Sequence, residues 1–168
     1  MKRVLGTLLL TLLPALAGAG WFTRTWPDTL ARVHREFPSV QSISPATLAA
    51  GAPGEPPLLL DVRTPAEYAV SHLHGAQRAE SLDAALRLLQ GRPATAPVVV
   101  YCSVGWRSSA LAVALQQAGF SAVYNLEGGI FTWANEDRPL YRGEQRVHLV
   151  HPYNRDWGAL LREDLRSG

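Results

Sequence analysis

The single cysteine of this 168-residue chain, Cys102, is the side chain best suited to chemistry. It follows an uncharged, β-branched run over 98–101 that predicts a buried strand. A helix is expected over 107–117, so Cys102 begins a six-residue loop between strand and helix. A helix start exposes unpaired backbone N–H groups and the positive end of the helix dipole. Such a loop binds anions and favours the thiolate, which is the nucleophilic form of cysteine.

Two neighbours of Cys102 favour a reactive thiol. Gly105 allows a backbone turn that other residues resist, and Arg107 adds a permanent positive charge. The alternative is that a lone cysteine after an apolar strand is only a small core residue. Because glycine and arginine stand at these spacings, we favour the nucleophile over the core residue.

The remaining chain alternates apolar strands with amphipathic helices, which predicts an α/β fold with a parallel sheet covered on both faces. Strands are expected over 40–43, 58–62, 75–79, 98–101 and 122–126, the last being the final strand. Helices are expected over 26–37, 45–50, 82–89, 107–117 and 130–135, with another starting at Pro65. This order places Asp61 at the same edge of the sheet as Cys102.

Charged side chains follow the strand over 58–62. Asp61 is expected to bind loop amides or cap a turn, with a role in orienting the active loop or in acid–base chemistry as the alternative. Arg63 and Glu67 stand on either side of Pro65 and are spaced to form a structural ion pair. His72 is expected to bond a backbone carbonyl.

The N-terminus has the pattern of an export signal. Lys2 and Arg3 precede an uncharged run over 4–23, and small residues over 17–19 form a cleavage site. The alternative is an uncleaved membrane anchor extending to about residue 23. Both interpretations, a cleaved signal and an uncleaved anchor, place the domain in the periplasm or on the outer face of the cytoplasmic membrane. Without these two cations the chain has 14 basic and 14 acidic residues, so its charge does not indicate nucleic-acid binding.

Four segments are therefore expected. They are a signal over 1–19, an N-terminal helical extension over 20–38, a domain over 39–140 and a C-terminal extension over 141–168. The helix of the N-terminal extension is expected to pack on the sheet. In the C-terminal extension, 147–150 is expected to be extended, and Asn154 to cap a helix that reaches Leu165 and packs on the domain. Docking a partner is the alternative for both helices.

Three signatures in this order resemble one known family. Residues 60–68, 71–76 and 102–108 read LDVRTPAEY, SHLHGA and CSVGWRS, and 118–130 continues the pattern. They are similar to the rhodanese-like sulfurtransferases over about 43–140. The resemblance implies a rhodanese-like fold with a central parallel sheet of about five strands. His74 departs from the proline that is usual in the family, and Trp106 occupies a variable loop position.

The resemblance also implies a sulfur-transfer reaction. The Cys102 thiolate would take the outer sulfur of a donor such as thiosulfate, and a thiol or cyanide would then accept that sulfur. The implied substrate-binding residues are Ser103, Val104, Gly105, Trp106 and Arg107, with Asp61 and Arg63 as supporting residues. The implied partners are a small sulfur donor and acceptor, with a protein thiol as an alternative acceptor. Nucleic acid is not expected, nor a membrane unless the N-terminal segment is uncleaved.

No metal or organic cofactor is expected. The histidine pairs at 72 and 74 and at 148 and 151 have no cysteine or acidic cluster at ligand spacing. Two other functions remain open at this point. One is an exported persulfide carrier or binding module without turnover. The other is a phosphatase or arsenate reductase, but their loops have five residues between Cys and Arg. Here there are four, and the smaller loop suits a sulfur atom better than a tetrahedral phosphate.

Overall fold

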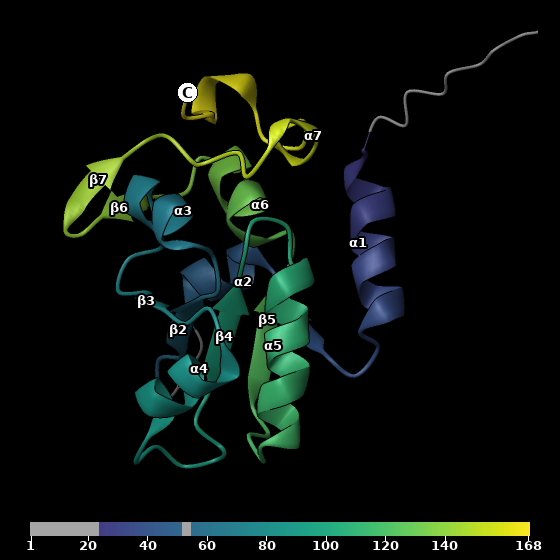
Figure 1. The fold of residues 1–168 in the computed structure, drawn as a ribbon, viewed down its shortest axis with the longest axis vertical. Helices are drawn as coiled ribbons and strands as arrows, with labels where there is room; N and C mark the ends of the chain where they lie inside the picture. Colours follow the sequence, from purple (N-terminus) through teal and green to yellow (C-terminus); the bar gives the residue numbers. More distant parts are fainter. Residues whose placement is uncertain (1–23, 52–54) are drawn as a thin grey trace, which may run out of the picture.

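A five-stranded parallel sheet forms the centre of the computed structural model, which describes residues 24–51 and 55–168 (Figure 1). The strand order is β1-β5-β4-β2-β3, and all neighbouring pairs are parallel. The strands are β1 Gln41–Ile43, β2 Leu58–Asp61, β3 Gln77–Arg78, β4 Val98–Tyr101 and β5 Val123–Leu126. The parallel five-stranded sheet expected from the sequence is thus confirmed. The expected signal or anchor lies outside the described residues.

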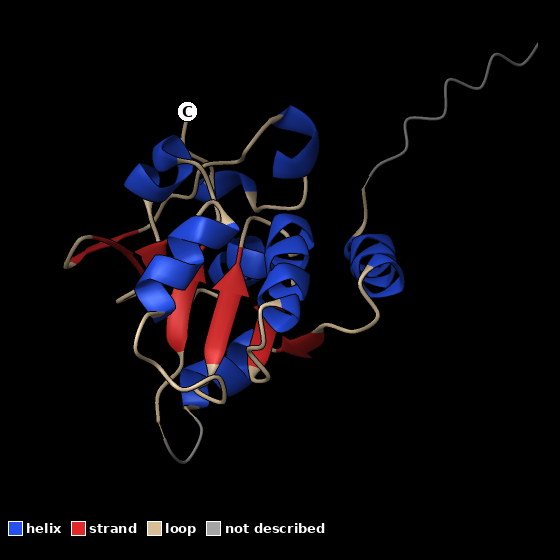
Figure 2. Cartoon of the chain, turned by 60° about the horizontal axis from the view of Figure 1, so that its bottom comes forward, coloured by secondary structure: helices blue, strands red, loops and turns tan. Residues whose placement is uncertain are grey.

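The central strand β4 shows why both faces of the sheet are covered. Val98 and Val100 pack into one apolar cluster with α4 (Leu82–Leu89) and α5 (Trp106–Gln117), whereas Val99 and Tyr101 pack into a second cluster with α6 (Gly129–Asn135). A strand buried on both faces needs an unbroken apolar sequence, as β4 has. Figure 2 shows helices on both sides of the sheet. The covering helices are α4, α5, α6 and α2, which spans Pro45–Ala50.

Side-chain caps start five of the described helices, three of which pack around the sheet. The hydroxyls of Ser44, Thr64 and Ser81 accept hydrogen bonds from the third backbone N–H of α2, α3 (Pro65–Val70) and α4. In α3, Glu67 also turns back to the Thr64 N–H and completes a capping box. This cap fixes Glu67 in a buried position at the edge of the sheet where β2 ends.

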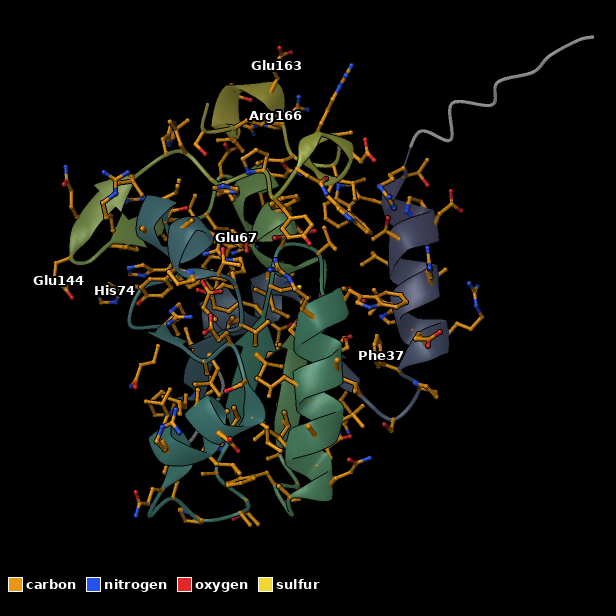
Figure 3. All side chains as sticks on the ribbon, in the orientation of Figure 1. Phe37, Glu67, His74, Glu144, Glu163 and Arg166 are labelled. Carbon is orange, nitrogen blue, oxygen red and sulfur yellow. The ribbon has the colours of Figure 1, made fainter. Side chains whose placement is uncertain are left out.

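The sequence led us to expect helix α1, Trp26–Glu36, to pack on the sheet, but it does not cover either face. It lies beside α5 and the edge strand β1 (Figure 1). The Phe37 ring, which Figure 3 labels between α1 and α5, meets the Trp106 ring edge-on at 5.3 Å. The His34 side chain reaches Ser42 of β1 at 3.4 Å. Only Thr29 and Val33 of the helix are buried, which is too little apolar surface to cover a sheet.

The C-terminal extension differs most from expectation. An antiparallel hairpin, β6 Leu140–Arg142 and β7 Gln145–Val147, follows what was expected to be the last strand. The expected helix up to Leu165 is wrong, because only α7 Arg155–Gly158 and a 3-10 turn at Glu163–Leu165 form. The Asn154 cap is confirmed, as its side chain accepts the Trp157 N–H.

The chain packs closely where α7 ends. Gly158 lies so close to Pro152 that a Cβ there would stand 2.9 Å from the proline ring. Leu160, Leu161 and Leu165 are buried in the apolar cluster that contains α6. The extension therefore packs on the domain, as expected, but through turns. Within 24–51 and 55–168, no helix combines the length and apolar character that crossing a membrane requires.

Candidate active site

Cys102 stands directly after β4, and its side chain is almost fully buried. Its Sγ accepts a hydrogen bond from the Gly105 N–H at 3.1 Å, so the loop turns back over the sulfur. This turn requires a φ of 101° at Gly105, in the left-handed region that favours glycine. A Cβ at this position would also stand 3.0 Å from the Asn125 amide nitrogen. The loop geometry therefore depends on Gly105.

The loop leaves several backbone donors available. Among the described residues, the N–H groups of Ser103, Val104, Trp106 and Arg107 have no hydrogen-bond partner. The last two belong to the first turn of α5, where N–H groups lack helical partners and the helix dipole is positive. Together these donors can bind an anion next to the cysteine.

The start of α6 holds the loop from the other side. The Ile130 N–H donates to the Cys102 carbonyl at 2.9 Å, and the Phe131 N–H donates to the Ser103 carbonyl at 3.1 Å. Gly129 packs against the same carbonyls and has a φ of 57°. A side chain at Gly129 would collide with this backbone. The loop is therefore fixed between the starts of two helices.

Asn125 on β5 is a site residue that the sequence analysis missed. Its Nδ2 donates to the Gly105 carbonyl at 3.3 Å, and its Oδ1 accepts the Ser108 hydroxyl at 2.6 Å. The Ser109 hydroxyl also donates to the Gly105 carbonyl, at 2.7 Å. Asparagine is uncommon in strands, so a buried Asn inside the apolar run 123–126 was the available signal.

Glu67 is the second residue that the sequence analysis missed. Its carboxylate accepts two hydrogen bonds from Arg107, at 2.7 and 2.8 Å, and one from the Ser103 hydroxyl at 3.0 Å. Arg107 also donates to the Ser103 hydroxyl at 2.9 Å. Figure 3 labels Glu67 near the start of α5. The expected pair between Arg63 and Glu67 is therefore wrong.

The capping-box geometry explains this difference. Glu67 turns back toward Thr64, which places its carboxylate at the Cys102 loop rather than along the helix face. A Thr-x-x-Glu pattern was visible in the sequence and was the signal for this orientation.

Charges in this cluster stabilise one another. Burial alone would raise the pKa of Glu67, but hydrogen bonds from Arg107 and Thr64 outweigh burial and lower it to about 2. Burial opposes the charge on Arg107, yet its hydrogen bonds to Glu67 and its proximity to Cys102 raise its pKa. Both groups therefore stay charged throughout the physiological range.

Asp61 and Arg63 pair with each other beneath the loop. The Arg63 Nε donates to Asp61 Oδ1 at 2.9 Å, and both side chains are fully buried. Asp61 also accepts the Arg63 backbone N–H at 3.0 Å, in line with the expected bond to a loop amide. Asp61 lies beside Tyr101 in the sheet, and Tyr101 directly precedes Cys102 in the chain. Neither residue of this pair lines the cavity over Cys102.

A cavity of about 110 Å³ lies over the cysteine. Its walls include five of the predicted site residues, namely Cys102, Ser103, Val104, Trp106 and Arg107. Gly105 is not among the lining residues and acts through the backbone. Tyr153 and Trp157, from the C-terminal extension, complete the lining.

Tyr153 was not predicted as a site residue. Its ring lies under the Arg107 guanidinium at 4.7 Å, a distance typical of a cation–π contact. Its φ of 65° is unusual for an aromatic residue. No motif near Tyr153 indicated this position, because the loop that carries it lies about 50 residues beyond the cysteine.

His72 and His74 contact backbone groups and a glutamate. His72 Nδ1 lies 3.0 Å from the Leu73 carbonyl, as expected, and its Nε2 accepts the Gly143 N–H. His74 lies 3.2 Å from Glu144 at the hairpin, where Figure 3 labels both. In the described part of the chain, no three His, Cys, Asp or Glu side chains cluster as metal ligands would.

Comparison with known proteins places this site in context. Residues 44–136 match the model of the "Rhodanese-like domain". The chain is 39% identical over 82 residues to "Probable adenylyltransferase/sulfurtransferase MoeZ" of Mycobacterium tuberculosis, covering 48% of this chain but only 21% of that protein. It is 36% identical over 76 residues to "Thiosulfate sulfurtransferase GlpE" of Pseudomonas fluorescens, covering 45% of this chain and 69% of the relative.

Solved structures agree with these matches. A rhodanese-related protein from Thermoplasma volcanium superposes with a TM-score of 0.51 and is 25% identical in sequence. The likeness covers 61% of this chain and 98% of that one. Helix α1 and the segment that carries Tyr153 and Trp157 both lie outside the residues that match the family model.

Proposed function

The chain belongs to the rhodanese-like family, and on this premise we propose that it is a sulfurtransferase that carries sulfur as a persulfide on Cys102. One observation supports this most. The only cysteine lies at the carboxyl end of the central strand, under a loop whose N–H donors and Arg107 surround one small cavity. This is a site for a thiolate that reacts with a small anion.

In the first step the Cys102 thiolate attacks the outer sulfur of thiosulfate. A new S–S bond forms to Cys102, and the S–S bond of thiosulfate breaks. Sulfite leaves with the electron pair of that bond. Backbone N–H groups and Arg107 bind the anionic donor and stabilise the charge on the departing sulfite.

In the second step an acceptor thiolate attacks the outer sulfur of the persulfide. The acceptor gains that sulfur, and Cys102 leaves as a thiolate, ready for the next donor. Cyanide can replace the thiol and leaves as thiocyanate. In each step the bond that forms and the bond that breaks balance in electrons, so the transfer needs no external oxidant or reductant.

Two features support thiosulfate as the donor. The cavity has room for only a few heavy atoms, and it presents a cation and unpaired N–H groups rather than carboxylates. A relative that matches over two thirds of its own length is named as a thiosulfate sulfurtransferase.

The test compares wild type with Cys102→Ser in two measurements. Intact mass after incubation with thiosulfate detects the added sulfur atom, and thiocyanate formation with cyanide measures turnover. We expect loading and turnover in wild type and neither in Cys102→Ser. The serine variant should keep its circular dichroism and unfolding midpoint, because oxygen replaces sulfur in a loop with little change of shape.

The two measurements also separate an enzyme from a carrier. Substantial turnover in the serine variant would contradict the mechanism. Loading without turnover on cyanide or any thiol would favour the persulfide carrier over the enzyme.

A further inference from the structure

A second cavity adjoins the one over Cys102. It has a volume of about 360 Å³ and lies between α1 and the C-terminal extension. The two cavities share Trp106 and Trp157 as walls. The other lining residues come from α1 and the two residues before it, and are Arg24, Thr25, Asp28, Thr29 and Arg32. We call this second cavity the α1 groove.

Positive side chains outnumber negative ones in the lining of the α1 groove. Arg24 stacks over the Trp157 ring at 3.8 Å, and Arg32 lies over the Trp106 ring at 5.0 Å. Neither arginine forms an ion pair with a described residue. Among the described residues, Asp28 is the one acidic side chain that lines the groove, and its carboxylate accepts the Thr25 hydroxyl at 2.7 Å. The groove therefore presents two unpaired cations against one hydrogen-bonded carboxylate.

Its position relative to the cysteine limits what it can bind. A molecule lying in the groove between the two tryptophans has one end beside the cavity that holds Cys102. Small-molecule sites commonly have volumes of roughly 300–1,000 Å³, so the groove suits a small ligand. Thiosulfate needs only the smaller cavity, which leaves the α1 groove for the second substrate.

We propose that the α1 groove selects acceptor thiols that carry a carboxylate some atoms away from the sulfur. This proposal rests on the proposed function and names the substrate class of its second step. Arg32 and Arg24 bind the carboxylate, Trp106 and Trp157 flank the carbon chain, and the thiol reaches the Cys102 persulfide. Because α1 and α7 lie outside the region of the family match, this selectivity comes from the two extensions.

The experiment isolates the acceptor step. The full-length protein is loaded with thiosulfate, freed of donor, and mixed with one of three thiols: mercaptopropionate, mercaptoethanol or cysteamine. These are anionic, neutral and cationic. Loss of the persulfide from Cys102 gives a second-order rate constant for each thiol. Comparing each thiol with itself between wild type and variant cancels its intrinsic nucleophilicity.

Arg32→Gln is the decisive variant, since its side chain is exposed and lies at the groove. We expect the rate constant for mercaptopropionate to fall about 3- to 10-fold, the range for an ion pair that remains partly solvated. The value for mercaptoethanol should stay unchanged, and that for cysteamine should not fall. Added salt should reduce the wild-type preference for the anion.

Two control variants make the result specific. Arg32→Lys keeps the charge above Trp106 and should keep most of the preference for mercaptopropionate. Arg35→Gln removes the same charge from an exposed position of α1 that lines neither cavity, and should behave as wild type.

The outcomes separate the two proposals. If the protein loads and transfers sulfur but Arg32→Gln affects all three thiols alike, or Arg35→Gln has the same effect, selection by the groove is refuted and the sulfurtransferase remains. If wild type never loads, or transfers sulfur to no thiol, the proposed function is refuted and the groove inference with it.

Discussion

Replacing Glu67 by Gln tests whether one buried carboxylate holds the candidate active site together. In wild type this carboxylate accepts hydrogen bonds from Arg107, from the Ser103 hydroxyl and from the N–H and hydroxyl of Thr64. The amide of Gln has the same shape but only one acceptor oxygen. Its NH₂ group would face donors, and Arg107 would lose its counter-charge.

The expected loss of stability follows from two independent magnitudes. Removing one member of a buried ion pair costs about 3–5 kcal/mol, and Arg107 is partly exposed, which favours the lower end. The pKa of Glu67 lies at about 2 instead of its usual 4.5, and each pKa unit corresponds to about 1.4 kcal/mol. Both lead to an expected loss of about 3 kcal/mol in the free energy of unfolding at pH 7.

The pH dependence has a definite sign. The pKa of Glu67 is lowered in the folded state, so its stabilisation is complete above the unfolded value of 4.5. That stabilisation is lost as the pH falls from 4.5 to about 2, because in this range the unfolded chain takes up a proton at the Glu67 carboxylate while the folded protein does not. The difference between wild type and Glu67→Gln should therefore be constant above about pH 5.5 and shrink below 4.5.

Urea unfolding of both proteins between pH 3 and pH 7 measures this difference, with equal m-values as a check on two-state behaviour. Glu36→Gln is the matched control, since Glu36 is exposed on α1 and forms no ion pair with a described residue. Its stability should stay within about 0.5 kcal/mol of wild type. If Glu67→Gln is as stable as that control at pH 7, the carboxylate does not anchor the loop.

Two further predictions concern Arg107 and the N-terminus. Arg107→Lys keeps the charge but loses the double hydrogen bond to Glu67. In steady-state kinetics, kcat/KM for thiosulfate should therefore fall about 10- to 150-fold. An unchanged kcat/KM would show that the planar guanidinium is not needed. Cleavage after Ala19 should leave a mature chain that begins at Gly20, which N-terminal sequencing determines; a membrane-bound chain that retains Lys2 would favour the anchor.

The sheet was predictable from the sequence because its strands have a simple pattern. β4 is an unbroken apolar run, β2 is apolar up to its last residue Asp61, and each helix on the sheet starts at a recognisable cap or a glycine turn. Local chemistry decides such features, so a few neighbouring residues suffice. The position of Cys102 at the end of β4 follows from the same local pattern.

The partners of the charged residues were not predictable in this way. Arg63 and Glu67 have the spacing of a helical pair, but Arg63 lies before α3 and turns back to Asp61. Glu67 then meets Arg107, which is 40 residues away in the chain. Arg63 therefore pairs with Asp61, and Glu67 pairs with Arg107. The second pair forms only because β2 and β4 lie side by side in the sheet.

The prediction of a continuous helix in the C-terminal extension failed for a different reason. Trp157, Leu160, Leu161 and Leu165 have helical spacing, and the three leucines do reach the core. They reach it through turns, because α7 ends at Gly158 and only a 3-10 turn at Glu163–Leu165 follows. A periodic pattern reports which side chains are buried, and burial alone does not require a continuous helix.

The cluster around Arg107 links stability to the proposed chemistry. One side of its guanidinium is fixed by Glu67 and Ser103, its face lies over Tyr153, and the same residue lines the cavity over Cys102. An arginine held on several sides loses little freedom when an anion binds, so its charge acts on the donor at low entropic cost. For the same reason a variant that releases Arg107, such as Glu67→Gln, should weaken donor binding as well as the fold. Distant substitutions that lower stability equally should leave donor binding intact.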